Sequence, residues 1–345
     1  MSSVCVTGGS GFLGSLLIAR LLNEGHEVTS IDLLPNNLSH PRLTAIVGDI
    51  RDRAMLDAAF AASRPVTVYH CAALLAHGSL NERELWSSNV EGTRTLAAAI
   101  AAARIRSVVY TSSNCLWGHG FDRPVREDDA PAPIEIYGHS KWEGEKILLA
   151  HAGDFATTVI RCPTIMDEGR LGLLSILFEF IAEGRRVWVV GDGGNRYQFI
   201  AASDLIAAML MAGETGHAGV YGIGSDDVST MRDTYAYVID RAGTGARIAS
   251  LPKGPTILGM QIAHHLKISP LGPYHYRMIA ADFVFDTSAI KRSLGWRPAL
   301  TNQQMLFRAY DYYARNRAEI EGRSDASAHR KSADMGVIRL LKWIS

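Results

Sequence analysis

Residues 7–14 read Thr-Gly-Gly-Ser-Gly-Phe-Leu-Gly, and they lie between a short β-rich run at residues 4–7 and a helical pattern of leucines. Gly8, Gly11 and Gly14 allow a tight turn, a close approach of the backbone to a pyrophosphate, and close packing of the helix on the strand. The N-terminus of that helix would direct its partial positive charge at the phosphates. The stretch therefore predicts a dinucleotide-binding loop.

Short β-rich runs alternate with helical patterns through the first half of the chain. The expected strands are residues 4–7, 27–31, 43–47, 66–70, 107–111 and 157–161, and the clearest helices are residues 12–22 and 96–103. This alternation is typical of βαβ units, in which a parallel sheet has helices on both faces. We therefore expect an α/β protein with a doubly wound parallel sheet, the Rossmann fold, because right-handed crossovers leave few other topologies.

Asp32 lies 18 residues beyond Gly14, at the end of the second expected strand. A carboxylate at that place can accept hydrogen bonds from both hydroxyls of a ribose. It would also repel a 2′-phosphate, and the following Leu33, Leu34 and Pro35 carry no cation to hold one. The cofactor expected at this loop is therefore NAD rather than NADP.

The regular alternation lapses after residue 161, where Gly, Pro and aromatic residues become frequent. We expect an NAD-binding domain in residues 1–163, to which residues 196–213 return. A smaller, interleaved substrate-binding domain would take residues 164–195 and 214–320. Within the returning segment, residues 199–205 look like a strand followed by a helix. Further on, Thr301 and Gln304 form a capping box that predicts the start of another helix.

Residues 321–345 are expected to form a polar linker and a short tail. The tail, residues 337–344, is apolar but includes Arg339 and Lys342. One interpretation is an amphipathic helix that contacts a membrane or a partner. The other, a helix packed on the body of the protein or across a dimer, is favoured because so short a segment is marginal as an independent helix.

The composition is that of an ordinary globular protein. Lys plus Arg and Asp plus Glu both number 35 among 345 residues, so no global positive charge recruits nucleic acid. The four cysteines are widely spaced without a Cys-x-x-Cys pattern, which indicates free thiols in a reducing compartment. We expect a cytoplasmic protein with a small-molecule substrate, no metal site and no transmembrane segment.

Tyr137-Gly138-His139-Ser140-Lys141 follows Ser113 by 24 residues. Read as one helical turn, the motif places the Tyr137 phenol and the Lys141 ammonium on the same face. The positive charge would stabilise the phenolate and lower its pKa, which makes Tyr137 a proton acceptor near neutral pH. Ser113 ends an expected strand at the edge of a parallel sheet where ligands bind, so its hydroxyl could hold a substrate oxygen. Together these three residues predict a catalytic group for alcohol and ketone redox chemistry.

In these motifs the chain resembles the extended short-chain dehydrogenase/reductases, specifically their NAD-dependent epimerase/dehydratase group, from residue 4 to about residue 315. The resemblance also rests on Gly48-Asp49-Ile50, His70-Cys71-Ala72-Ala73, Asn89, Thr111-Ser112-Ser113, Arg161-Cys162-Pro163, Arg196 and Leu294-Gly295-Trp296. It implies that Asp49 and Ile50 contact the adenine, that Ala72 and Ala73 line the cofactor, and that Lys141 also binds the nicotinamide ribose. It further implies a homodimer. The full set of expected cofactor-binding residues is Gly8, Ser10, Gly11, Phe12, Leu13, Gly14, Asp32, Asp49, Ile50, Ala72, Ala73, Asn89, Thr111, Tyr137, Lys141 and Cys162.

The substrate is less clearly indicated, and Ser113, Asn114, Thr164 and Arg196 are the residues expected to bind it. Asn114 and Cys115 stand where sugar dehydratases of the family carry an acidic pair, so dehydration is disfavoured. Cys115 could shuttle a proton next to a ketone if its pKa were lowered, but a small packing residue is the favoured interpretation. Arg196 resembles the arginine that holds the diphosphate of a nucleotide sugar.

Two enzymatic functions and one other therefore compete. The leading one is a nucleotide-sugar epimerase in which bound NAD oxidises a hydroxyl and then returns the hydride to the other face. The alternative is a dehydrogenase or reductase of an apolar secondary alcohol, similar to the hydroxysteroid dehydrogenases. It is favoured by Thr164, by Gln198, and by the apolar stretch at residues 255–263. A non-catalytic NAD-binding protein would not need Tyr137 and Lys141, and both are present.

Overall fold

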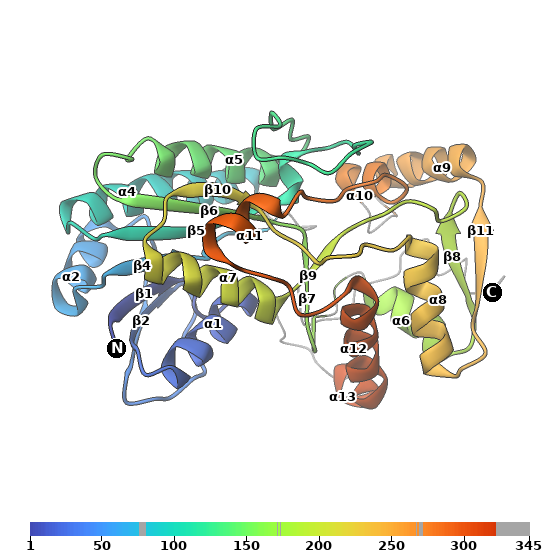
Figure 1. Cartoon of the computed structure of the whole chain (residues 1–345), viewed down its shortest axis with the longest axis horizontal. Helices are drawn as coiled ribbons and strands as arrows, with labels where there is room; N and C mark the ends of the chain where they lie inside the picture. The colour runs from blue at the N-terminus through green and yellow to red at the C-terminus, as the bar shows by residue number, and fades with distance from the viewer. Residues whose placement is uncertain (76–80, 171, 173, 267, 269–271, 322–345) are drawn as a thin grey trace.

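A seven-stranded, wholly parallel sheet forms the core of one half of the computed structural model, on the left in Figure 1. The structure describes residues 1–75, 81–170, 172, 174–266, 268 and 272–321. The strand order of the sheet is β10-β6-β5-β4-β1-β2-β3, which places β1 between β2 and β4. The strands are β1 (Ser3–Thr7), β2 (Glu27–Asp32), β3 (Leu43–Val47), β4 (Thr67–His70), β5 (Ser107–Ser113), β6 (Ala156–Cys162) and β10 (Gly219–Gly222). All six strands expected from the first half of the chain are confirmed.

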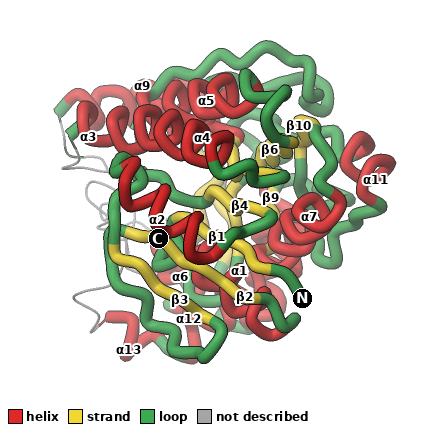
Figure 2. Tube along the Cα trace, turned by 90° about the vertical axis from the view of Figure 1, so that its left-hand side faces the viewer, coloured by secondary structure: helices red, strands yellow, loops and turns green. Residues whose placement is uncertain are grey.

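Helices cover both faces of this sheet, so the doubly wound topology is confirmed (Figure 2). One face packs against α1 (Phe12–Asn23), α7 (Ala202–Thr215) and α11 (Ser288–Leu294), and the other against α2 (Arg53–Ser63), α4 (Gly92–Ala102) and α5 (Ile136–Leu149). β5 is buried along its whole length because both of its faces are covered. The order reverses between β1 and β4, and doubly wound folds bind their ligands at such a point.

The rest of the chain builds two small parallel sheets and a set of helices (Figure 1). The small sheets pair β7 (Thr164–Met166) with β9 (Phe199–Ala201), and β8 (Arg186–Val190) with β11 (Arg247–Leu251). The helices here are α6 (Leu174–Ala182), α8 (Met231–Ala242), α9 (Lys253–His265), α10 (Pro273–Met278), α12 (Asn302–Arg315) and α13 (Arg317–Glu321). The capping box of Thr301 and Gln304 is present at the start of α12, as predicted. The expected tail at residues 337–344 lies outside the described residues.

The returning segment divides between the two parts of the molecule. Helix α7 packs on the main sheet, as expected, whereas strand β9 pairs with β7 in a small sheet. The seventh strand of the main sheet is instead β10, which pairs with β6. The main sheet therefore extends into residues 219–222, which lie beyond the segment expected to return to it. Within the described residues, no helix is long and apolar enough to cross a membrane.

Candidate active site

The glycines after β1 are required by close backbone contacts. Gly8 has a φ of 73°, and a Cβ atom placed on it would lie 2.6 Å from the nitrogen of Ala72 at the end of β4. A Cβ on Gly14 would lie 2.1 Å from the carbonyl oxygen of Gly8. The turn therefore brings the N-terminus of α1, with Phe12 and Leu13 buried, directly to the carboxyl ends of β1 and β4. This backbone cradle fits the pyrophosphate of a dinucleotide.

Asp32 closes this loop from the end of β2. Its carboxylate accepts a hydrogen bond from the Ser10 nitrogen at 3.0 Å and another from the Leu34 nitrogen at 2.9 Å. A carboxylate has about four lone-pair positions, so it can still accept the two hydroxyls of a ribose. The neighbouring Leu33 and Leu34 are exposed and uncharged. The residues present therefore fit NAD.

Asp49, which is expected to contact the adenine, belongs to a chain of ion pairs. Asp49 pairs with Arg51 at 2.6 Å, and Arg51 pairs with Glu84 at 2.8 Å. The Arg51 guanidinium lowers the pKa of Asp49, so this carboxyl is ionised. Its oxygens already accept hydrogen bonds from Arg51. Ile50 is buried, and a Cβ on Gly92 of α4 would lie 2.8 Å from its side chain. Contact of Asp49 and Ile50 with adenine stays a prediction.

Asn89 connects the cofactor side to the catalytic helix. It lies in a π-helical turn (Ser87–Glu91), a distortion that is frequent at functional sites. Its side chain bonds both the nitrogen and the oxygen of Leu74, at 2.7 and 3.0 Å, and donates to the Ser140 hydroxyl at 3.0 Å. Ser140 in turn donates to the Tyr137 carbonyl at 2.8 Å. Asn89 therefore positions the segment with Ala72 and Ala73 against the helix that carries the catalytic pair.

Ser113, Tyr137 and Lys141 are brought together at the carboxyl edge of the sheet. Ser113 is the last residue of β5, and α5 carries Tyr137 and Lys141 one turn apart. Helix α5 can approach closely because a Cβ on Gly138 would lie 2.2 Å from the carbonyl oxygen of Cys115. The Ser113 hydroxyl forms a hydrogen bond with the Tyr137 phenol. The predicted catalytic group is thus assembled in space.

The electrostatics of this group differ from the sequence-based expectation. The pKa of Tyr137 is raised above its ordinary value, because burial among apolar groups outweighs the hydrogen bond from Ser113 and the charge of Arg170. Burial also lowers the pKa of Lys141 to about 8. The Lys141 ammonium lies 4.2 Å from the ring centroid of Tyr110. The expected lowering of the phenol pKa by Lys141 is therefore wrong for the protein without cofactor.

Arg170 is a residue near the catalytic group that sequence reasoning missed. Its guanidinium lies 5.2 Å from the ring centroid of Phe12, at the start of α1, and its charge acts on Tyr137 and Cys162. Burial lowers the pKa of Arg170 to about 10, so it stays charged at neutral pH. No local pattern in the sequence marks Arg170, because only the fold brings it to the start of α1.

A buried histidine lies beneath the cofactor loop. His70 bonds Thr7 at 2.7 Å and Thr93 at 2.9 Å, and its ring stacks on Tyr110 at 5.2 Å. Burial, together with the charge of Lys141, lowers the pKa of His70 to about 3, so the imidazole is neutral. It joins β1, β4 and α4, and its role is structural.

Two further expected cofactor residues lie beside the catalytic lysine. The Thr111 hydroxyl lies 3.8 Å from the Cys71 sulfur, and the Cys162 thiol donates to the Ser112 carbonyl at 3.2 Å. Burial raises the pKa of Cys162 to about 12, so it stays a neutral thiol. Their contact with NAD stays a prediction.

A tyrosine pair faces the catalytic serine from the C-terminal part of the chain. The Asn114 amide donates to the Tyr197 hydroxyl at 2.6 Å and to the Tyr274 hydroxyl at 2.8 Å, and these hydroxyls lie 3.2 Å apart. Thr164 also forms a hydrogen bond with Tyr197. Two of the expected substrate residues, Asn114 and Thr164, thus meet on Tyr197, which the sequence did not single out.

Cys115 lies next to this pair, and burial raises the pKa of its thiol to about 11. A neutral thiol is a poor proton acceptor at neutral pH. This agrees with the favoured interpretation of Cys115 as a packing residue.

Arg196 lies apart from the catalytic group. In this extended segment, side chains alternate between two sides, and Tyr197 points to Asn114. Arg196 and Gln198 line a separate cavity of about 290 Å³, together with Phe121, Asp122, Arg123, Pro124, Ser225, Asp226, Asp227, Val228, Asp282, Val284, Phe285 and Thr287. None of the predicted catalytic residues lines that cavity. The structure therefore places the Tyr197 phenol, rather than the Arg196 guanidinium, in contact with Asn114.

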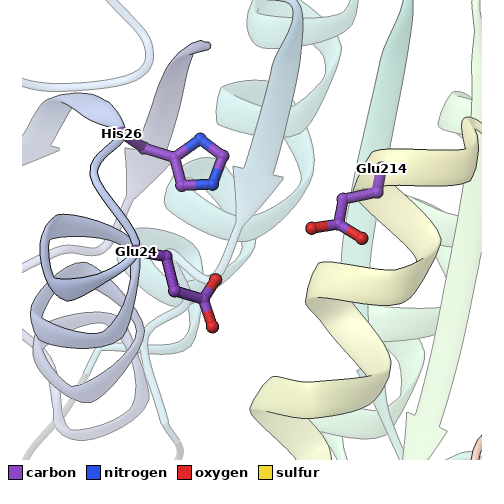
Figure 3. A group of neighbouring side chains, drawn as sticks. All are labelled: Glu24, His26 and Glu214. Atoms are coloured by element: carbon purple, nitrogen blue, oxygen red, sulfur yellow. The ribbon is translucent and has the colours of Figure 1, made fainter. Parts of the chain in front are cut away.

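A His and two Glu form a separate group at the opposite edge of the sheet (Figure 3). Glu24 follows α1, His26 precedes β2, and Glu214 lies near the end of α7. Glu24 is already paired with Arg20, and the Ser2 hydroxyl lies 3.2 Å from His26. These contacts account for part of the group, and we assign it no role in the reaction.

The comparisons with known proteins agree with the expected family, fold and cofactor. A family model described as the NAD dependent epimerase/dehydratase family matches residues 4–224. The chain belongs to this family. It is accordingly an NAD-dependent enzyme, and its cofactor is NAD.

Similar proteins include both functional classes that the sequence left open. Uncharacterized protein y4nG of Sinorhizobium fredii is 36% identical, over 99% of this chain and 86% of its own length. A 3-beta-hydroxysteroid dehydrogenase of Mycolicibacterium neoaurum is 28% identical over 91% of this chain and 92% of its own. A UDP-glucose 4-epimerase of Neisseria meningitidis is 37% identical, but over 43% of this chain and 48% of its own.

The solved structures support the fold. A UDP-glucose 4-epimerase of Thermotoga maritima, solved with UDP-glucose, has a TM-score of 0.73 at 21% identity. The match covers 91% of this chain and 99% of the other. Identity at this level shows a common fold and leaves the substrate open.

Proposed function

We propose that this enzyme is an NAD-dependent dehydrogenase or reductase of an apolar secondary alcohol, with a 3β-hydroxysteroid as the model substrate. The observation that carries the proposal is the orientation of residues 196–198. Tyr197 faces the catalytic serine through Asn114, whereas Arg196 lines another cavity. A nucleotide-sugar enzyme needs cations for a diphosphate, and phenols and an amide suit a ligand with few charges.

The similarity along the chain supports the same choice. The 3-beta-hydroxysteroid dehydrogenase match extends over nine tenths of both chains, whereas the Neisseria epimerase match covers less than half of each. The substrate-binding part of the chain is therefore better accounted for by the former. Nucleotide-sugar epimerisation, the leading expectation from the sequence, relied on Arg196 for the diphosphate, and the lining of another cavity by Arg196 argues against that role.

The catalytic residues have separate tasks in this reaction. Ser113 holds the substrate oxygen, and Tyr137 as phenolate accepts the hydroxyl proton, so that the alcohol becomes a ketone. NAD, when bound, accepts the hydride from the same carbon. Arg170 supplies positive charge near the phenol, which offsets part of the cost that burial imposes on the phenolate, and Lys141 is expected to bind the nicotinamide ribose. The buried position of this group also keeps bulk water from the reacting carbon.

The test is to mix purified enzyme and NAD with a 3β-hydroxysteroid, and separately with UDP-glucose, and to follow NADH absorbance. We expect NADH to accumulate over many turnovers with the steroid and not with the sugar. The Tyr137→Phe variant controls for contaminating activity. Conversion of the UDP-sugar to its epimer without NADH release would instead establish the epimerase.

Assembly and location remain predictions. We expect a homodimer from the family resemblance and a cytoplasmic protein from the cysteine usage. Sedimentation of the purified full chain, at several concentrations, tests the first expectation.

A further inference from the structure

Helix α9 has an exposed apolar stripe. Leu258, Ile262 and Leu266 are 57%, 53% and 63% exposed, and their spacing of four residues places them on one face of the helix. Leu266 caps the helix and continues its hydrogen-bonding pattern by donating to the Ile262 carbonyl. Ile268 and Ile279 extend the patch at 49% and 39% exposure. Exposed apolar side chains grouped in this way mark an interaction surface.

The charged side chains within this segment of the sequence have one sign. Residues 251–281 contain no Asp or Glu, but they contain Lys253, Lys267 and Arg277 and three histidines. An anionic surface complements a segment whose charged side chains are all basic, because no carboxylate of the segment repels it. Apolar side chains on one helix face, with basic residues nearby in the sequence, are the pattern of helices that lie in the interface of an anionic membrane.

The other side of α9 leads to the active site. α9 packs on α10, which follows it along one edge of the molecule (Figure 1). The Lys253 ammonium donates to the Ala280 carbonyl at 3.0 Å and so fixes the start of α9 to the segment after α10. α10 carries Tyr274, whose hydroxyl accepts from Asn114 beside the catalytic serine. Helix α9 is therefore linked through α10 to a residue that contacts Asn114, one of the expected substrate residues.

We propose that the face of α9 formed by Leu258, Ile262 and Leu266 binds the surface of an anionic lipid membrane. The protein lies on the membrane and does not cross it, in agreement with the absence of a spanning helix among the described residues. The lipid contact does not depend on the proposed substrate. If the substrate is an apolar alcohol, the contact also brings the site to the phase in which that alcohol dissolves.

The experiment measures sedimentation of the full chain with vesicles. Vesicles of equal parts phosphatidylcholine and phosphatidylserine are compared with vesicles of phosphatidylcholine alone. We expect strong binding to the first kind, at least tenfold weaker binding to the second, and release by salt, because screening weakens the contribution of the basic residues. The Leu258→Glu and Ile262→Glu variant should lose at least tenfold in binding.

Two controls separate this surface from others. Val66→Glu changes an exposed apolar residue outside the patch, at the opposite edge of the sheet, and should bind as the unaltered protein does. Leu340→Glu with Leu341→Glu in the tail should also leave binding intact. Loss of binding in the tail variant, with normal binding in the α9 variant, would overturn the proposal. So would dissociation of an oligomer by the α9 substitutions in the absence of lipid, because the stripe would then contact a second copy.

Discussion

The cofactor half and the substrate half of this molecule are built by different means. In the cofactor half, backbone atoms form the site, as in the contact between Gly14 and the Gly8 carbonyl. In the substrate half, side chains from distant segments form it, as in the contacts of Asn114 with Tyr197 and Tyr274. A site made of backbone atoms is formed by consecutive residues, so a sequence motif indicates it. A site made of side chains depends on which side of its strand each side chain faces. This difference explains why the cofactor could be read from sequence and the substrate could not.

The largest expected effect is on chemistry at the junction of the two halves. Tyr137→Phe removes the proton acceptor and should reduce turnover by about 1000-fold, within the range typical of general acid–base catalysis. NAD binding should survive, since the cradle around Gly8 does not involve the phenol. Steady-state kinetics and NAD titration of the same preparation measure both. Retained turnover would remove Tyr137 from the mechanism.

The next prediction concerns the glycine loop of the cofactor half, where an added methyl group should disturb the backbone. Gly14→Ala places a methyl group 2.1 Å from the Gly8 oxygen, so the loop must move, and NAD affinity should fall about 100-fold, or about 2.7 kcal/mol. Isothermal titration with NAD measures the change, and circular dichroism checks the fold.

A matched variant of the same loop is Gly11→Ala. Its added carbon would lie 3.1 Å from the same oxygen, so a small adjustment can accommodate it. We expect a much smaller loss of affinity. Equal losses of NAD affinity in the two variants would show that the contact with the Gly8 oxygen does not determine the affinity.

A third prediction tests which of two adjacent side chains, Tyr197 or Arg196, contributes to substrate binding. Tyr197→Phe removes a hydroxyl that contacts Asn114 and should raise KM by about 2- to 10-fold, the effect of one hydrogen bond. Arg196→Ala changes the adjacent residue and should leave KM unchanged. Kinetics with the same alcohol compare the two. The reverse result, a large effect of Arg196 and none of Tyr197, would restore the diphosphate interpretation.

These contrasts also show what the sequence could predict of the fold. The six early strands are clear because they are β-rich and buried. Strand β10 was missed because Gly219-Val220-Tyr221-Gly222 is short and contains two glycines, which are unfavourable in strands. Its place in the sheet depends on pairing with β6, a contact between distant segments.

The site divides in the same way. Ser113, Tyr137 and Lys141 follow from a helical spacing and a strand end, so their assembly was predictable. Which side Arg196 faces could not be predicted, because a shift of one residue along an extended segment changes the side that a side chain faces. The raised pKa of Tyr137 was also unpredictable, because burial depends on the whole packed structure.

The smallest expected effect is a dependence of NAD affinity on pH. Lys141 is charged below its pKa of about 8 and neutral above it, so NAD affinity should weaken as pH rises through this range. Near pH 8 about half of the charge is lost, and the affinity should differ by about twofold from that at pH 7. The Lys141→Met variant should show a weaker affinity that does not change across this range. The same pH dependence in both proteins would assign it to another group.

The central claim is that NAD oxidises an apolar alcohol held by Ser113 and Tyr137, and that the hydride leaves in NADH. It is tested most directly with a 3β-hydroxysteroid that carries deuterium on the carbinol carbon, by mass spectrometry of the products. We predict deuterium in released NADH, in an amount equal to the ketone formed, and none with Tyr137→Phe. Lack of turnover with the steroid, together with deuterium retained in the epimer when UDP-glucose labelled at its reacting carbon is supplied, would contradict the account.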